Sequence, residues 1–253
     1  MLLKVDNNFD ILSLKKFDRI VSLVPSLTET IADLKGAEQL VGVTRFCKYP
    51  PDVCIEKTNI GGTKTVKFNK INKLNPDIIL AVKEENNRKE IIALSENYKV
   101  LLFDILSLKD VITMIKVLGR IVDNYGGAEQ IIKKLTRKFS YLHTATLNSA
   151  IYLIWKNPWM AAGKKSFINE MMRYAGFENI IQGRYPEVEN KDFKNAEFIL
   201  LSSEPFPFNE KHQNELRSLY PDKKVIIVDG EMFSWYGTHL LKAPDYFKSI
   251  KKG

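Results

Sequence analysis

Aromatic residues gather in the stretch VDGEMFSWYG, Val228 to Gly237, and they are the first candidates for chemistry. Phe233 and Trp235 follow an apolar, strand-like run, with a single serine between them. Such a cluster either fills a hydrophobic core or stacks on a flat ligand. Both residues are candidate ligand contacts, and Phe233 is the one that better suits a core position.

Other candidates lie in loops that follow apolar runs, where a rigid scaffold usually carries binding residues. The first half of the chain contributes Arg45 and Phe46 in GVTRFCKYPP, Thr63 and Lys64 in IGGTKTVKF, and Lys83 in AVKEENNRKE. The second half contributes Trp159 and Met160 in KNPWM and Tyr185 in GRYPEV. Neither GVTRFCKYPP nor IGGTKTVKF has the glycine spacing of a phosphate-binding or dinucleotide-binding loop.

Two segments at strand ends also suit helix starts. In VPSLTET, Ser26 and Glu29 have the S-x-x-E spacing of a capping box. The backbone amides of the same helix start could alternatively line a pocket. From Glu85 onward, AVKEENNRKE is predicted to begin a helix, because early carboxylates favour the positive end of the helix dipole.

Residue types that enzymes use for catalysis are few and lack the expected spacing. No nucleophile motif or metal-ligand spacing surrounds the histidines, which are His143, His212 and His239. Ser26 lacks a G-x-S-x-G context, and no base is identified for it or for Cys47. Cys47 and Cys54 are interpreted as a reduced pair, not as a disulfide framework or a zinc site. The sequence therefore favours a binding protein with no required cofactor over an enzyme.

Short apolar runs rich in β-branched residues recur between helical patterns. They are RIVSLV (19–24), LVGV (40–43), DIILAV (77–82) and KVLLF (99–103) in the first half, and AIYLIW (150–155), EFILL (197–201) and KVIIVD (224–229) in the second. Continuous apolar strands that alternate with helices predict parallel sheets covered on both faces.

A longer helical pattern separates the two sets of runs. Apolar residues recur at helical spacing up to Val122, Ser107 can cap the start, and Gly126 with Gly127 can end it. This predicts a helix of about 17 residues and about 25 Å, followed by a second helix through AEQIIKKLTRKFSYL. The predicted fold class is α/β: two Rossmann-like lobes, residues 1–106 and 147–253, joined by a long backbone helix in a helical connection at 107–146, with a ligand cleft between the lobes.

Composition limits the possible partners. The 253 residues carry a formal net charge of +8, but the basic residues are scattered and no nucleic-acid motif accompanies them. The polar residues from Asp6 to Asp10 interrupt the N-terminal segment, which has no signal-peptide core, and no apolar stretch approaches the roughly 18 residues of a membrane span. As written, the chain is expected to be a cytoplasmic monomer without nucleic-acid partners, and a periplasmic one if the true start lies upstream.

The order of these segments resembles the periplasmic-binding-protein family for iron siderophores and cobalamin, class III, in the subgroup of helical backbone metal receptors. The resemblance covers nearly the whole chain and is carried by RIVSLVPSLTET, LNPDIILAV, AAGKKSFINEMMRYAGFENI, RYPEV, SSEPFPF and DGEMFSWYG. It implies a solute-binding protein that holds a metal chelate, a corrinoid or a ferric siderophore-like compound, between its lobes. The metal would then arrive inside its chelate.

Known relatives also suggest roles for the candidate residues. In cobalamin-binding members, aromatic side chains from both lobes hold the corrin ring. By resemblance, the comparable positions here are Phe46, Met160, Tyr185, Phe233 and Trp235. The cations Arg45, Lys64 and Lys83 are expected to meet carboxylate or phosphate groups on the periphery of the chelate.

The resemblance further implies a partner, the permease of an ABC importer. Relatives that dock on a permease have a glutamate seven residues before the proline of the PD motif and another three after the valine of YPEV-like loops, where this chain has Asn69 and Lys191. Neighbouring acids, Glu187, Glu189 or Asp192, could substitute. Two alternatives stay open: a cytoplasmic ligand- or protein-binding module of the same fold without transporter docking, and an enzyme that acts on a tetrapyrrole.

Overall fold

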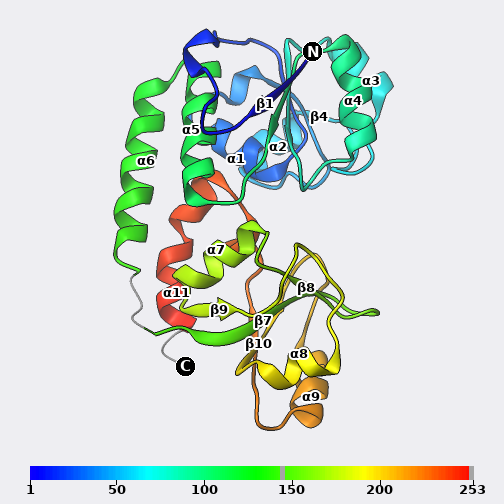
Figure 1. The fold of residues 1–253 in the computed structure, drawn as a ribbon. Helices are drawn as coiled ribbons and strands as arrows, with labels where there is room; N and C mark the ends of the chain where they lie inside the picture. The colour runs from blue at the N-terminus through cyan, green and yellow to red at the C-terminus, as the bar shows by residue number, and fades with distance from the viewer. Residues whose placement is uncertain (143–145, 251–253) are drawn as a thin grey trace. The chain divides into compact units, whose positions relative to one another are not determined.

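The computed structural model describes residues 1–142 and 146–250 and divides into two compact units (Figure 1). Unit 1 comprises Met1–Leu135 and Tyr236–His239, and unit 2 comprises Thr136–Trp235 and Leu240–Gly253. The chain passes from unit 1 to unit 2 inside helix α6 (Tyr125–Ser140). The expected connection at 107–146 includes residues 143–145, which lie outside the described part of the chain, and its boundaries stay a prediction.

Unit 1 is built on a six-stranded parallel sheet with the order β1-β6-β5-β2-β3-β4. The predicted apolar runs are confirmed as β2 (Ile20–Ser22), β3 (Leu40–Val43), β5 (Ile78–Val82) and β6 (Val100–Phe103). The edge strands β1 (Leu2–Val5) and β4 (Thr58–Asn59) are not predicted by the sequence, because β4 is short and exposed and β1 buries only Val5. A strand without a buried face carries little hydrophobic signal.

Helices follow most strands of this sheet, as parallel connections require. They are α1 (Pro25–Asp33), α2 (Pro51–Glu56), α3 (Phe68–Leu74), α4 (Arg88–Asn97) and α5 (Leu108–Ile121), with short 3-10 turns η1 (Ile11–Ser13) and η2 (Ala37–Gln39). The helix predicted from Glu85 starts later, at Arg88. Asn87 caps it, and its side chain accepts a hydrogen bond from Lys89 N at 2.9 Å.

Ser107 caps α5 as predicted. Its Oγ accepts from Asp110 N at 3.2 Å, and the Asp110 carboxylate accepts from Ser107 N at 2.9 Å. The predicted end of this helix at Gly126 and Gly127 is wrong. The helix ends at Ile121, before the left-handed Asp123 (φ 57), and both glycines lie in the first turn of α6.

Close packing explains why glycine occurs in this helix pair. A Cβ on Gly119 of α5 would come within 2.4 Å of the Ala128 Cβ of α6. The two helices lie side by side in Figure 1. Gly119 and Ala128 are small residues that let the two backbones approach, whereas nothing lies within 4 Å of a Cβ added to Gly126.

Unit 2 contains a second sheet, with the order β11-β10-β7-β8 and with β9 paired to β7. The predicted runs are confirmed as β7 (Asn148–Trp155), β10 (Phe198–Ser202) and β11 (Lys224–Val228), which are parallel. Two short strands, β8 (Met160–Ala162) and β9 (Phe177–Asn179), are not predicted, and β8 runs antiparallel to β7. The two sheets and their helices confirm the predicted α/β class.

The helices of unit 2 are α7 (Phe167–Tyr174), α8 (Asn190–Asn195), α9 (Glu210–Leu219), α10 (Glu231–Ser234) and α11 (Ala243–Ile250). Ser166 caps α7 by accepting from Asn169 N at 3.4 Å. The α7 face that includes Phe167 and Met171 is buried.

A short C-terminal segment, Tyr236–His239, returns to unit 1 at the start of the 3-10 turn η3 (Gly237–Leu241). Thr238 N donates to Thr30 Oγ1 of α1 at 3.2 Å. Gly237 has a φ of 72°, and a Cβ there would lie 2.0 Å from Thr30 Oγ1. Only glycine fits this position without strain.

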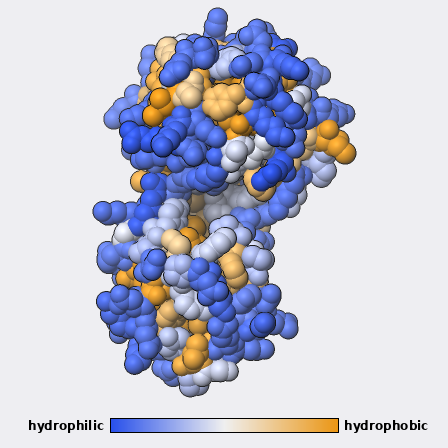
Figure 2. Space-filling view, turned by 90° about the vertical axis from the view of Figure 1, so that its right-hand side faces the viewer, coloured by the Kyte–Doolittle hydropathy of each residue, from blue (hydrophilic) through white to orange (hydrophobic). Residues whose placement is uncertain are grey.

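The molecular face in Figure 2 is mainly hydrophilic, with scattered apolar patches. Phe46 and Trp155 are among the large apolar side chains that stay exposed, at 48% and 42%. Within the residues that the structure describes, no helix combines the length and apolar character needed to cross a membrane.

Candidate functional site

Loops after β3, β4 and β5 meet at the carboxyl edge of the unit 1 sheet, where open α/β proteins usually bind ligands. Arg45 N donates to Gly61 O at 2.8 Å, which joins the first loop to the second. Lys64 Nζ donates to Glu84 O at 2.5 Å, which joins the second to the third. The structure therefore brings together the loops that carry the candidate contacts from the first half of the chain.

Asn86 holds two of these loops in place. Its side chain is buried, and its Oδ1 accepts from Val82 N at 2.9 Å. Its Nδ2 donates to Thr63 O at 2.9 Å. The Asn86 amide thus satisfies a backbone group at the end of β5 and another in the loop after β4, which fixes the spacing of the two segments. The Thr63 backbone is thus part of the support of the edge, and the Thr63 side chain is half-exposed.

Arg45 and Phe46 form an exposed pair on the Gly61–Gly62 turn. The Arg45 guanidinium carbon lies 4.9 Å from the centre of the Phe46 ring. A Cβ on Gly62 would come within 3.2 Å of the ring and 3.7 Å of the guanidinium. Gly62 therefore lets both side chains lie close to the turn, a role that the sequence does not assign to it.

The two candidate lysines of this edge already have partners. Lys83 forms an ion pair with the Asp104 carboxylate. Lys64 donates to a backbone carbonyl, which carries no formal charge. Lys83 is thus neutralised locally, whereas Lys64 keeps its charge.

The start of α1 differs from the predicted capping box. Val24 is the N-cap and makes no side-chain cap hydrogen bond, and Pro25 is the first helical residue. Ser26 is 3% exposed, and its Oγ is buried without a hydrogen-bond partner in the described part of the chain. The capping interpretation of Ser26 and Glu29 is wrong, because Pro25 supplies the fixed φ that favours a helix start.

Glu29 instead forms a buried pair with His239. One carboxylate oxygen lies 2.9 Å from the imidazole Nδ1, and the side chains are 8% and 2% exposed. The Tyr49 ring lies next to the imidazole, with 5.6 Å between ring centres. A separation of 210 residues hides this pair from any reading of local spacing.

Both cysteines are free thiols, in agreement with the predicted reduced pair. Burial raises the pKa of the Cys47 thiol, whose Sγ lies 3.2 Å from Thr28 Oγ1. Burial also raises the pKa of Cys54 to about 11, and this thiol donates to Tyr49 O at 3.4 Å. A thiol that stays protonated at neutral pH is a poor nucleophile.

In unit 2, Trp159 packs on the core cluster under the sheet. Its ring stacks on Phe208, with 5.9 Å between centres and 8° between planes, and meets Phe193 edge-on at 6.1 Å. Lys156 Nζ lies 5.1 Å from the ring centre. Much of the Trp159 surface is therefore used within the unit. Met160 follows as the first residue of β8 and is half-buried.

Tyr185 lies half-buried in a loop that backbone hydrogen bonds fix in place. Gly163 N donates to Arg184 O at 2.7 Å, and Ala161 N donates to Pro186 O at 3.1 Å. These bonds on either side of Tyr185 hold its backbone against β8 and against Gly163, the residue that follows β8.

The two aromatic candidates of the opening stretch differ in burial. Phe233 is 0% exposed, with its ring 5.1 Å from that of Tyr152 and 4.9 Å from that of Phe247. It is a core residue, as its alternative interpretation states, and it leaves the set of candidate ligand contacts. Trp235 is half-buried, and its Nε1 donates to Glu204 Oε1 at 3.0 Å.

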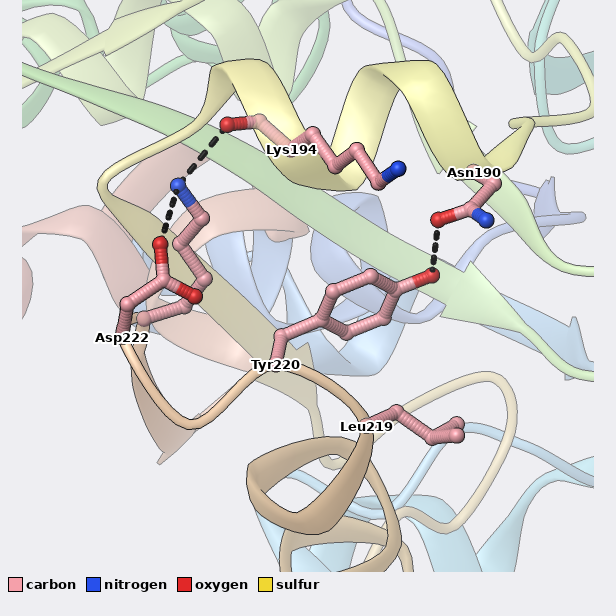
Figure 3. Close-up of a pocket in the computed structure, with 6 residues that line it drawn as sticks. Asn190, Lys194, Leu219, Tyr220 and Asp222 are labelled. Carbon is pink, nitrogen blue, oxygen red and sulfur yellow. Dashed lines mark hydrogen bonds and ion pairs between the residues drawn. The ribbon is translucent and has the colours of Figure 1, made fainter.

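A separate surface pocket of about 390 Å³ lies in unit 2 (Figure 3). It is lined by Asn190, Lys194, Leu219, Tyr220, Asp222 and Lys223. Lys223 Nζ donates to Lys194 O at 2.8 Å and pairs with Asp222 at 3.0 Å, and Tyr220 OH donates to Asn190 Oδ1 at 3.0 Å. These lining groups largely satisfy one another, and none of the sequence-predicted ligand contacts lines this pocket.

Within residues 1–142 and 146–250, no group of three or more His, Cys, Asp or Glu side chains is placed to hold a metal ion. The His212 Nδ1 accepts from Asn209 N at 3.2 Å. His143 lies outside the described residues.

A family model and curated relatives match the sequence. The model described as periplasmic binding protein matches residues 20–204. A vitamin B12-binding protein of Vibrio vulnificus (strain YJ016) is 25% identical over 182 residues. That match covers 68% of this chain and 65% of the relative, so the chain spans slightly less than two thirds of the relative's length.

Solved structures share the fold. The periplasmic vitamin B12 binding protein BtuF of Vibrio cholerae superposes with a TM-score of 0.79 at 19% identity, over 95% of this chain and 100% of that one. The periplasmic heme binding protein HutB of Vibrio cholerae superposes with a TM-score of 0.78 at 16% identity, over 93% and 99%. At these identities the likeness establishes the fold.

Proposed function

Because this chain belongs to the periplasmic binding protein family, we propose that it is a solute-binding protein whose ligand is a metal chelate of the corrinoid, haem or ferric siderophore type. Relatives named for vitamin B12 and fold neighbours named for vitamin B12 and heme support this ligand class. The observation that carries the proposal is the exposed Arg45–Phe46 pair at the carboxyl edge of unit 1, since it presents a half-exposed aromatic ring together with the cation that lies over it. Such a surface suits a planar chelate with polar substituents.

The proposed contacts are the sequence candidates that keep accessible surface. They are Arg45, Phe46, Thr63, Lys64 and Lys83 in unit 1 and Trp159, Met160, Tyr185 and Trp235 in unit 2. Their aromatic and thioether groups bind by stacking and dispersion.

Titration of the purified protein with cobamides, haem and ferric siderophores tests the proposal. Binding is expected to quench fluorescence from Trp155, Trp159 and Trp235 and to shift the visible absorption of the chelate. A folded protein that gives neither signal with any member of this panel would contradict the proposal. The visible spectrum of protein purified from its own host gives an independent check, because corrinoids, haem and ferric chelates are coloured.

Delivery to the permease of an ABC importer is the second part of the proposal. At the positions compared with docking glutamates, Asn69 is exposed and neutral, and Lys191 is exposed and pairs with Glu189 at 2.9 Å. We infer that a permease partner of this chain lacks the arginine that would repel Lys191. Photo-crosslinking from Asn69 and from Lys191 in host membranes tests whether the protein docks on a permease. Capture of a permease supports delivery, whereas stoichiometric capture of a soluble protein favours a binding module without transporter docking.

The place of action follows from the same proposal. The family is described as periplasmic, and delivery to an importer requires the protein to meet the outer face of the membrane. Fractionation of host cells tests the location, and recovery of the protein with the cytoplasm would favour the module without transporter docking.

A further inference from the structure

The charge around the Arg45–Phe46 pair is unevenly compensated. Lys83 is neutralised by the Asp104 carboxylate, and Lys64 donates to the carbonyl of Glu84. In the described part of the chain, the Phe46 ring is the partner of the Arg45 guanidinium, and no carboxylate neutralises it. Arg45 is therefore the cation of this edge whose hydrogen-bond donors are most available to a ligand.

The surrounding structure also limits where the guanidinium lies. Arg45 N is held by Gly61 O at 2.8 Å, and Gly62 N donates to Thr65 O at 2.8 Å, which closes the turn beneath the pair. Since a Cβ on Gly62 would come within 3.2 Å of Phe46, the turn and the ring are in close apposition. A guanidinium held over an aromatic face stays charged, and the orientation of its plane is restricted. Its N–H groups form a fork that matches a carboxylate.

We propose that Arg45 selects ligands by charge: the chelate carries a carboxylate that the Arg45 guanidinium binds while a flat part of the chelate lies against Phe46. This rests on the proposed function and names the subclass, carboxylate-bearing chelates over neutral ones. Burying a guanidinium under a neutral ligand removes water from its donors without replacing those hydrogen bonds, so neutral chelates bind more weakly.

Matched ligand pairs test this proposal. Hemin is compared with its dimethyl ester, and cobyrinic acid with its heptamethyl ester, so that ring and metal stay the same while the carboxylate charge is removed. Dissociation constants come from tryptophan quenching and visible absorption. The acid of a pair that binds is expected to bind about 10- to 100-fold more tightly than its ester, as for hydrogen bonds to charged groups.

Variants then assign the preference to Arg45. Arg45→Gln is expected to weaken the acid about 10- to 100-fold and to leave the ester nearly unchanged. Phe46→Leu is expected to weaken acid and ester alike, because it removes the flat face and keeps the cation. Lys133→Gln, which removes one charge from an exposed position on α6, is the control for net charge. Circular dichroism checks that each variant is folded.

The outcomes separate this proposal from the proposed function. Equal affinity for acid and ester, equal losses in Arg45→Gln for both, or binding of neutral chelates alone overturns charge selection and leaves chelate binding in place. If the ligand is another member of the titration panel, such as a ferric siderophore, the same variant tests the proposal. Its affinity for Arg45→Gln must then be lower than for the unmodified protein. Binding of no chelate at all overturns both.

Discussion

The imidazole Nδ1 of His239 lies 2.9 Å from the Glu29 carboxylate, inside unit 1, although the two residues are 210 positions apart. Both side chains are almost fully buried. The pair fixes the segment Tyr236–His239 to α1, together with the hydrogen bond between Thr238 N and Thr30 Oγ1. The folded state of unit 1 thus depends on residues from near the end of the described chain.

Removing one member of this pair is expected to destabilise the protein. His239→Ala leaves the Glu29 carboxylate buried without its imidazole partner, and the loss is expected to be about 3 kcal/mol. Urea unfolding measures it. In a double-mutant cycle with Glu29→Ala, the combined loss should be smaller than the sum of the single losses, whereas simple additivity would show that the pair is not coupled.

Breaking an exposed ion pair, Lys191 with Glu189, gives a control for the loss of the buried pair of Glu29 and His239. Lys191→Ala removes the partner of Glu189 on the surface of α8, where water and salt screen the attraction. No measurable change in the urea midpoint is expected from this variant.

Gly237→Ala should show how tightly the returning segment is held. The substitution forces a side chain into a φ of 72° and places its Cβ 2.0 Å from Thr30 Oγ1. A loss of about 2 kcal/mol or more in the free energy of unfolding is expected. Gly126→Ala is the control, because nothing lies within 4 Å of the added Cβ. It should be neutral or stabilising by up to about 1 kcal/mol. Equal effects of the two variants would contradict the geometry.

Substitutions of Phe233 and of Phe46 are expected to have different effects, the first mainly on stability and the second mainly on chelate binding. Phe233→Ala opens a cavity between Tyr152 and Phe247 and is expected to cost about 3 to 5 kcal/mol. Phe46→Ala changes a side chain that is 48% exposed, so the loss of stability should stay below about 1 kcal/mol. Thermal unfolding and chelate titration are measured on both. A large loss of stability in Phe46→Ala would show that this ring is structural.

The Cys54 thiol predicts a change of stability at alkaline pH. Its pKa is raised from the ordinary 9.0 to about 11, so the folded protein keeps this proton at pH values where the unfolded chain releases it. The contribution is present below pH 9.0 and is lost as the pH rises towards about 11. Cys54→Ser lacks this titration, and its stability should fall less steeply between these pH values. Urea unfolding across the range measures the difference, and parallel curves for the two proteins would contradict it.

Strands with a buried face were predictable from the sequence, and strands at the margins were not. The run Ile78–Val82 is buried at every position, and its apolar, β-branched letters indicate a central parallel strand. Thr58–Asn59 is exposed at both positions, and its place in the sheet depends on pairing with β3. That information lies in tertiary contacts and not in the local pattern.

Helix ends illustrate the same limit. Ser107 and Ser166 indicate helix starts because each accepts a hydrogen bond from a backbone N–H only three residues away in the sequence. Ser26 and Glu29 are three residues apart, like Ser107 and Asp110, yet the Glu29 carboxylate pairs with the imidazole of His239, which is distant in sequence. Gly126 and Gly127 look like a helix end, although both lie inside α6.

The candidate site was predictable as a set of loops but not in its details. The sequence places Arg45 and Phe46 after a strand, and the structure adds their cation–π contact and the support from Gly62. The sequence favours a core position for Phe233, but it does not establish that this side chain has no accessible surface, and it does not indicate that Asp104 neutralises Lys83. Both facts depend on neighbours that are distant in sequence.

The return of Tyr236–His239 to unit 1 has a consequence for synthesis. A ribosome releases the six strands of the first sheet well before it reaches this segment, so a nascent chain must keep the α1 surface open, with Glu29 hydrated, until about 130 further residues have been added. Unit 1 is therefore completed only after Thr136–Trp235, most of unit 2, has been synthesised.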